Sequence, residues 1–452
     1  MYFLYNVLLG IGFAILLPKF LLDAWRHGKY VTGLRERLGF VEKLDRKVGP
    51  VLWLHCVSVG ETQAARPLLQ ALRRDFPHYR IVVSTITVTG QQLASEIFKD
   101  EVERVLYFPL DWRWAVQRSV RAIEPSVVLL METELWPGFL RECHRRRIPA
   151  VIVNGRLSEK SFRRYGWIRS FISQVLNCLD LAIMQSEADA KRIRALGLEP
   201  ERVLVSGNIK FDAGTTRERD SLTAELAARF GLAGRAVILA ASTHDPEERL
   251  IIEAFRDLRQ QRSELRLIIA PRHPERFAEV AALLNACGLP WARRTATRTP
   301  EDENCQIILL DTIGELRSVL PLSSIAFVGG SIAPVGGHNI LEPAAVGACI
   351  VTGPHTANFG EIVKTFLEAE ALVQLADLPE TELITKLAAV FGELLGDHEL
   401  RMVMGQRARN LVDENRGATE RTIQVLRKIL TVPRVVENAG DVTIAKQGLQ
   451  ST

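Results

Sequence analysis

The sequence has 452 residues, of which 47% are hydrophobic and 24% are charged, which is the composition of a globular protein that can bury large cores. Its formal net charge is only +4, so its overall field is too weak for a dedicated nucleic-acid-binding protein, and no nucleic-acid partner is predicted. The six cysteines form no Cys-x-x-Cys pair and no cluster with histidine, which argues against structural zinc and against a disulfide framework.

Residues 1–22 are almost wholly apolar and about long enough to cross a bilayer core. A signal peptide fits poorly, because no basic residue precedes the apolar run and no small-residue cleavage site closes it. Basic residues follow instead: Lys19, Arg26, His27, Lys29, Arg35 and Arg37. The positive-inside rule therefore predicts a membrane anchor over 1–22, with the rest of the chain against the anionic cytoplasmic leaflet. The alternative is a hydrophobic first helix that docks on the body of the protein.

From residue 51 onward, short β-rich runs alternate with amphipathic helical stretches, a pattern typical of a parallel sheet covered by helices. The first half of the chain is expected to form these strands: 51–55, 81–85, 104–108, 127–131, 151–153, 181–184 and 203–205. The apolar pattern lapses in a polar stretch over 212–219, which is predicted to be an interdomain linker. The first domain is therefore expected to span 23–211.

The alternation restarts after the linker and predicts a second domain over 220–432. Its expected strands are 237–240, 267–270, 307–310, 325–328 and 350–352, and its closing helices are 380–395, 399–415 and 419–430. The polar, aperiodic tail over 433–452 is predicted to be disordered. The fold class is thus α/β, with two Rossmann-like domains facing across a cleft at the carboxyl ends of both sheets.

Acidic residues follow two of the predicted strands in the first domain. The first strand leads to Ser58, Gly60 and Glu61, and Glu61 is placed in the first turn of a helix, facing the cleft. The alternative role for Glu61 is to cap the helix dipole. The fourth strand ends in Glu132 and Glu134, whose like charges and partial burial would raise a carboxylate pKa and could poise a base. These two acids could instead pair with nearby arginines: Arg141, Arg145 and Arg156.

Several turns at predicted strand ends could bind an anion. Lys210 lies at the interdomain hinge and is either an anion contact or a solvated linker residue. Two turns of the second domain offer backbone N–H groups, and Arg272 adds a forked, permanently charged donor suited to phosphate. The residues of these turns are Ser242, Thr243 and His244, and Arg272 and His273.

Glycines dominate the turn that follows the strand predicted at 325–328. Gly329, Gly330 and Ser331 would let the main chain approach a phosphate, although glycine-rich turns are often only tight corners. A helix starting near Asn339 or Ile340 would direct its positive end at that phosphate, and Glu342 could bind a ribose diol. The fingerprints of nucleotide hydrolysis, G-x-x-x-x-G-K-[ST], and of hydride transfer, G-x-G-x-x-G opening the first domain, are both absent.

Taken in order along the chain, these motifs resemble a known family. The strings are HCVSVGE, METELWP, SGNIKFD, PRHPERF, DTIGEL, FVGGS and GGHNILEP. They are similar to those of the bacterial 3-deoxy-D-manno-octulosonic acid (Kdo) transferases, which build the inner core of lipopolysaccharide. The resemblance implies a GT-B fold, CMP-Kdo as donor, lipid IVA as acceptor, inversion at the anomeric carbon, an inner-membrane location, and no metal or cofactor.

The resemblance also implies roles for individual residues. Glu61 matches the family's catalytic base, and Glu132 and Glu134 match an acidic site needed for activity. The donor side is expected to comprise Lys210, Ser242, Thr243, His244, Arg272, His273, Gly314, Glu315, Gly329, Gly330, Ser331, Asn339 and Glu342. The acceptor side is expected to comprise Ser58, Gly60 and Arg156. The chain departs from the family pattern at Cys56 and Ile340, neither of which has a proposed catalytic role.

A nucleotide-sugar epimerase is the alternative enzyme, because the same scaffold serves both reactions and a fold does not determine a function. The predicted anchor argues against it, since a soluble sugar nucleotide does not require a membrane. A lipid-binding module without catalysis would keep the anchor and its basic flank but would not need Glu61.

Overall fold

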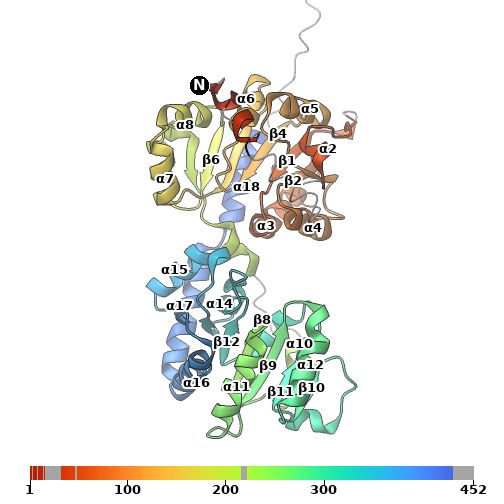
Figure 1. Ribbon diagram of the computed structural model, residues 1–452, viewed down its shortest axis with the longest axis vertical. Coiled ribbons are helices and arrows are strands. Elements are labelled where there is room, and N and C mark those ends of the chain that lie inside the picture. The colour runs from red at the N-terminus through yellow and green to blue at the C-terminus, as the bar shows by residue number, and fades with distance from the viewer. Residues whose placement is uncertain are drawn as a thin grey trace, which may run out of the picture.

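The structure is a computed structural model that describes residues 1–2, 4–7, 9–13, 15, 32–45, 48–214 and 221–430. The described chain forms two α/β units, one above the other in Figure 1, and each is built on a seven-stranded parallel sheet. Most of the predicted linker, at 215–219, and the predicted tail over 433–452 lie outside the described residues.

The first sheet has the strand order β3-β2-β1-β4-β5-β6-β7, and all its neighbouring pairs are parallel. Its strands are β1 (Val51–His55), β2 (Arg80–Thr85), β3 (Arg104–Tyr107), β4 (Val127–Met131), β5 (Ala150–Gly155), β6 (Leu181–Met184) and β7 (Val203–Val205). Helices cover both faces, which is why central strands such as β1 and β4 are buried at every residue and read as continuous apolar runs.

Alternate residues of these strands enter two separate cores. Trp53 packs with Phe108 and Phe139 on one face of the first sheet, whereas Leu52 and Leu54 belong to the core on the other face. The covering helices are α2 (Leu34–Arg37), α3 (Val59–Asp75), α4 (Val88–Ile97), α5 (Arg113–Ile123), α6 (Pro137–Arg145), α7 (Glu159–Gly166), α8 (Arg169–Leu176) and α9 (Glu187–Ala195).

The second sheet is also wholly parallel, with the order β10-β11-β9-β8-β12-β13-β14. Its strands are β8 (Val237–Thr243), β9 (Arg266–Pro271), β10 (Trp291–Arg293), β11 (Ile307–Leu309), β12 (Ile325–Val328), β13 (Cys349–Thr352) and β14 (Leu372–Gln374). Its helices are α10 (Ser221–Arg229), α11 (Glu247–Arg259), α12 (Phe277–Ala286), α13 (Leu316–Val319), α14 (Leu341–Ala345), α15 (Gly360–Glu368), α16 (Glu380–Gly396) and α17 (His398–Asn415).

Every predicted strand is present within a residue or a few of its expected bounds. The two strands that the sequence pattern missed are β10 and β14, at opposite edges of the second sheet. Each has only three residues, which is too short to show a hydrophobic period.

The last helix, α18 (Ala418–Leu430), returns to the first unit, where it is drawn in blue among the helices of the upper sheet (Figure 1). Ile423 and Leu426 are fully buried in the core of that unit. The carboxylate of Asp212, in η3 (Ile209–Gly214), accepts hydrogen bonds from the main-chain N–H groups of Gly417 (2.7 Å) and Thr419 (2.6 Å). The region predicted as the second domain, which ends at 432, therefore contains a helix that packs on the first sheet. Asp212 holds the chain at the start of this helix, where it passes back from the second unit to the first.

The N-terminal segment is helical at residues 2, 4–7, 9–13 and 15 and contacts the first unit. Tyr5 donates a 2.7 Å hydrogen bond to Asp111 Oδ2, and the ring of Phe13 packs edge-on against Trp112. These contacts match the alternative of a docked first helix for the residues concerned, while 16–22 lie outside the described residues. Within the described part of the chain, no helix is both long enough and apolar enough to cross a membrane.

Candidate active site

Each sheet has one point where the strand order reverses, and open α/β folds bind ligands in the crevice outside the carboxyl ends at that point. In the first sheet this point lies between β1 and β4, and in the second between β8 and β12. Glu61 follows β1 and Glu132 follows β4, while His244 follows β8 and Gly329 follows β12. The topology therefore brings the predicted motifs to the two switch points.

Glu61 is held in the first turn of α3. Its Oε2 accepts a 2.8 Å hydrogen bond from the main-chain N–H of Val57, and its Oε1 accepts a 3.2 Å bond from the hydroxyl of Ser58, the N-cap residue. A Cβ added at Gly60 would meet nothing within 4 Å, so the chain beside the carboxylate is open to an approaching molecule. The structure thus places Ser58, Gly60 and Glu61 side by side at the start of α3.

The pKa of Glu61 is raised to about 8. Burial is the largest cause and the negative charge of Glu132 is the second, while the hydrogen bond from Val57 opposes them and the charge of Glu134 adds to the rise. The pKa of Glu134 is also raised, by burial and then by Glu132. Burial and the neighbouring acids therefore outweigh the lowering expected from a helix N-terminus, and they bring Glu61 into the range that suits a general base near neutral pH.

Glu132 is paired with a cation, but not with any of the predicted arginines. Its backbone is left-handed, with φ 55, an uncommon conformation for a residue other than glycine that often marks a functional site. Lys210 Nζ lies 3.4 Å from Glu132 Oε1. Arg145 pairs with Glu142 instead. Lys210 therefore faces the acidic site across the hinge and is not a solvated linker residue.

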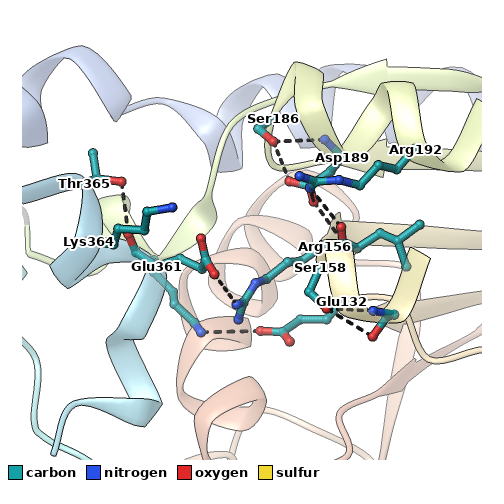
Figure 2. Close-up of polar contacts among 12 residues, drawn as sticks. Glu132, Arg156, Ser158, Ser186, Asp189, Arg192, Glu361, Lys364 and Thr365 are labelled. Carbon is teal, nitrogen blue, oxygen red and sulfur yellow. Dashed lines mark hydrogen bonds and ion pairs between the residues drawn. The ribbon is translucent and has the colours of Figure 1, made fainter. Parts of the chain in front are cut away.

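Arg156 reaches from the loop after β5 to the second unit. Its Nη2 lies 2.9 Å from Glu361 Oε1 on α15, and Figure 2 shows the two side chains pointing toward each other. The loop is fixed because Asp189 Oδ1 accepts from the Leu157 N–H (2.8 Å) and Arg192 Nη1 donates to the Leu157 carbonyl (3.0 Å). The Arg156 and Glu361 side chains are 37% and 60% exposed, so the ion pair is weak and leaves Arg156 accessible to solvent.

In the second unit, Arg272 and the turn after β8 lie side by side, because β8 and β9 are neighbours. Ser242 has a left-handed backbone (φ 56), which turns the chain at the end of the strand, and Thr243 is fully buried there. The exposed ring of His273 lies 5.2 Å from the ring of His244. Among the described residues, Arg272 has no ion-pair partner, which leaves its guanidinium available to an anion.

The main-chain N–H groups expected to bind a phosphate are already engaged by a buried acid, Glu247. Its carboxylate is fully buried and accepts from three predicted donor-side residues, His244, Gly330 and Ser331, and also from Ile332 and Ala333, at 2.8–3.3 Å. Gly329 is required here, because an added Cβ would lie 2.6 Å from the Ser242 carbonyl oxygen. The expectation that the Gly330 and Ser331 amides contact a phosphate directly is therefore not met in this structure.

The remaining predicted donor-side residues are held in local networks. Gly314 has φ 89, and Glu315 next to it pairs with Arg294 at 3.0 Å. Asn339 Oδ1 accepts from the Leu341 N–H at 3.0 Å, and its Nδ2 donates to Glu342 Oε1 at 3.3 Å. The helix expected to start at Asn339 or Ile340 is α14, which begins at Leu341 and has only five residues. The Glu342 carboxylate is thus held by Asn339 and, at 3.8 Å, by Arg317.

No role was predicted from the sequence for three residues that hold these segments in place. These are Glu247, which organises the glycine turn, His338, whose ring contacts His244, and Asp111, which accepts from the N–H groups of Gly138 and Phe139 at the start of α6. Each acts through a partner distant in sequence. In the described residues no group of three or more His, Cys, Asp and Glu side chains could hold a metal ion.

Comparison with known proteins identifies the family. The 3-deoxy-D-manno-octulosonic-acid transferase (kdotransferase) profile matches residues 32–213. A 3-deoxy-D-manno-octulosonic acid transferase from Haemophilus influenzae is 35% identical over 95% of this chain and 98% of its own length. The chain belongs to the Kdo transferase family. It is therefore a glycosyltransferase that acts in lipopolysaccharide synthesis, as the sequence motifs predicted.

The chain is also similar to two solved structures. The C-terminal CMP-Kdo binding domain of WaaA from Acinetobacter baumannii is 34% identical, with a TM-score of 0.38, and the match covers 42% of this Kdo transferase and 96% of that chain. A UDP-GlcNAc 2-epimerase from Neisseria meningitidis bound to UDP-GlcNAc has a TM-score of 0.53 at 12% identity, over 84% of this chain and 100% of its own. The second likeness is one of fold, a GT-B-like pair of parallel sheets, and it does not support the epimerase alternative.

Proposed function

We propose that this Kdo transferase moves Kdo from CMP-Kdo to a hydroxyl group of lipid IVA, with inversion and with Glu61 as general base. The observation that carries the proposal is the position of Glu61. It is a buried carboxylate at the switch point of the first sheet, with a pKa of about 8 and open space beside Gly60. A carboxylate with such a pKa can accept a proton from an attacking hydroxyl near neutral pH.

The proposed reaction is a direct displacement. The acceptor hydroxyl loses its proton to Glu61 as its oxygen forms the new bond to the anomeric carbon, and the bond to the CMP phosphate breaks. Charge builds up on the leaving phosphate, which Arg272 is placed to stabilise from the turn after β9. Glu132 and Glu134 keep the pKa of Glu61 high enough for this role, and Lys210 balances the charge of Glu132.

The direct test is to incubate the purified protein with CMP-Kdo and lipid IVA and to follow CMP release and lipid mass together. We expect CMP release to match a gain of one or more Kdo units on the lipid. CMP release without a gain in lipid mass would contradict the proposed acceptor, and conversion of the donor to an isomeric sugar nucleotide would favour the epimerase.

We further propose that the acceptor is met at the cytoplasmic leaflet of the inner membrane, through the apolar N-terminal segment. In support, Leu4, Ile11 and Ile15 recur at helical spacing and are 59%, 51% and 71% exposed, away from the face that holds Tyr5. Replacing these three with serine should reduce sedimentation with anionic lipid vesicles and raise the KM for lipid without changing CMP affinity. Serine at the exposed Met402 and Val403 of α17 is the matched control, and equal losses in both variants would contradict the proposal.

A further inference from the structure

Two histidines from different turns meet head to head at the switch point of the second sheet. His244 follows β8 and His338 lies in the glycine-rich loop after β12, and their Nε2 atoms are 2.8 Å apart. Their ring planes are only 9° apart, and the ring centroids are separated by 5.0 Å. Because this centroid distance is almost twice the N···N distance, the rings meet edge to edge in nearly one plane. This is the geometry of a good N–H···N hydrogen bond.

The hydrogen bond restricts the protons of the pair. A neutral imidazole carries one N–H, so when both rings are neutral one Nε2 donates and the other accepts. The first ring then has a bare Nδ1 and the second has an Nδ1–H. Addition of one proton at the bare Nδ1 leaves the shared Nε2–H···Nε2 bond in place and makes both Nδ1 atoms donors. One proton therefore converts the pair from one outward donor and one acceptor to two outward donors and a positive charge.

The surroundings keep the pair neutral in the unliganded protein. The pKa of His244 is lowered to about 4, by burial and then by His273, Arg276 and Arg272. The pKa of His338 is lowered to about 3, by burial and then by His244, Arg272 and His273.

The acids near the pair offset only one of these cations, Arg276. Glu248, at the start of α11, pairs with Arg276 at 3.1 Å, and Glu247 accepts from five main-chain N–H groups, one of which is that of His244 itself. The positive charge of Arg272 next to the two rings is therefore left without a counter-charge among the described residues. An anion bound at Arg272 would both remove the repulsion and attract a proton to the rings.

We propose that the His244–His338 pair takes up one proton from solvent when the phosphate of the donor nucleotide binds, and thereby places a positive charge beside that phosphate and turns the bare Nδ1 into a donor. This rests on the proposed function, because it places the donor phosphate at the β8 and β12 switch point. The pair then supplies positive charge to the phosphate. The main-chain N–H groups of the glycine turn do not, because they already donate to Glu247. The proton returns to solvent when CMP leaves, so the empty site carries less positive charge than the occupied one.

The test is isothermal titration of the full chain with CMP at pH 6.0, in buffers of different ionisation enthalpy, which reports the protons taken up on binding. The ligand's own ionisation is removed by subtracting the result for the double variant His244→Gln/His338→Gln. Glutamine keeps a hydrogen bond across the pair but cannot be protonated. We expect the wild type to take up about one proton more than the double variant, and its CMP affinity to rise by up to about tenfold more per pH unit as pH falls from 8 to 6.

Two single variants serve as controls. His78→Gln, at an exposed position of the first unit, and His273→Gln, in the same cluster, should both retain the uptake. Equal proton uptake in the wild type and the double variant would overturn the proposal, and so would loss of the proton uptake in His273→Gln. Neither result would contradict the assignment of the donor site. Failure of CMP to bind the wild type would instead overturn the donor assignment itself.

If the double variant does not fold, histidine 15N spectra of the wild type decide the matter. On addition of CMP, the Nδ1 signals of both histidines should take the protonated form. Unchanged tautomers would contradict the proton uptake.

Discussion

Lys210 Nζ lies 3.4 Å from Glu132 Oε1, and the charge of Glu132 is, after burial, the largest cause of the raised pKa of Glu61. The three side chains come from η3, from the end of β4 and from the first turn of α3. A cation at the hinge is thus linked electrostatically to the proposed base through one intervening carboxylate. Charge changes at Glu132 and Lys210 should therefore move the titration of Glu61 in opposite directions.

The proposed mechanism requires ionised Glu61, so it predicts that kcat/KM rises with pH and levels off above about 8. Glu132→Gln removes a repelling negative charge and should move this rise to lower pH by roughly 1 unit, whatever its effect on the maximal rate. Lys210→Met leaves the charge of Glu132 unbalanced and should move the rise to higher pH. Lys210→Arg is the control and should keep the wild-type profile. Profiles that all rise at the same pH would show that Glu61 is not the titrating group.

Glu61→Gln should lower transfer by about 10²–10⁴-fold, because glutamine cannot accept the proton of the hydroxyl. It should bind CMP with affinity close to that of the wild type, since Glu61 lies in the first unit and the proposed donor contacts lie in the second. Initial rates and CMP titrations measure the two effects. Retained turnover would exclude Glu61 as the base, and a parallel loss of CMP affinity would point to a structural role.

The same substitution should stabilise the fold at alkaline pH. The folded-state pKa of Glu61, about 8, lies above the ordinary value of 4.5 for a glutamate, so its protonation contributes stability that is fully present below about 4.5 and is lost as pH rises through about 8. Glutamine avoids the cost of burying the charge. The unfolding free energy of Glu61→Gln should therefore exceed that of the wild type increasingly between pH 5 and 9, by at most about 4 kcal/mol. Denaturant melts at several pH values measure this, and a constant difference would contradict the raised pKa.

Glu247→Gln should destabilise the second unit and weaken CMP binding. The carboxylate accepts from five main-chain N–H groups, and the glutamine amide would turn a donor toward some of them. Leaving buried N–H groups without an acceptor costs about 1–3 kcal/mol each. Thermal melts and CMP titrations check this. Glu253→Gln on the same helix breaks only a partly exposed ion pair with Arg249 and should cost less than about 1 kcal/mol.

The sequence pattern predicted the sheets and the strand ends well, because buried parallel strands such as β4 are apolar throughout and end abruptly at polar residues. It could not reveal partners that meet only through the fold. Glu247 is 83 residues from Gly330, and His244 is 94 residues from His338. The glycine turn reads equally well as a phosphate cradle or as a loop organised by an internal acid. Only the positions of the Glu247 oxygens distinguish these two roles.

Two glycines at strand ends should respond differently to alanine. At Gly329 an added Cβ would lie 2.7 Å from Glu247 Oε2 and 2.8 Å from the Thr243 Cα, so Gly329→Ala should cost about 1–3 kcal/mol and impair CMP binding. At Gly60 the Cβ would meet nothing, so Gly60→Ala should change stability by less than about 1 kcal/mol and leave CMP binding intact. If the space beside Gly60 receives the acceptor, this variant should raise the KM for lipid or lower kcat. Wild-type kinetics in Gly60→Ala would instead place the acceptor away from Gly60.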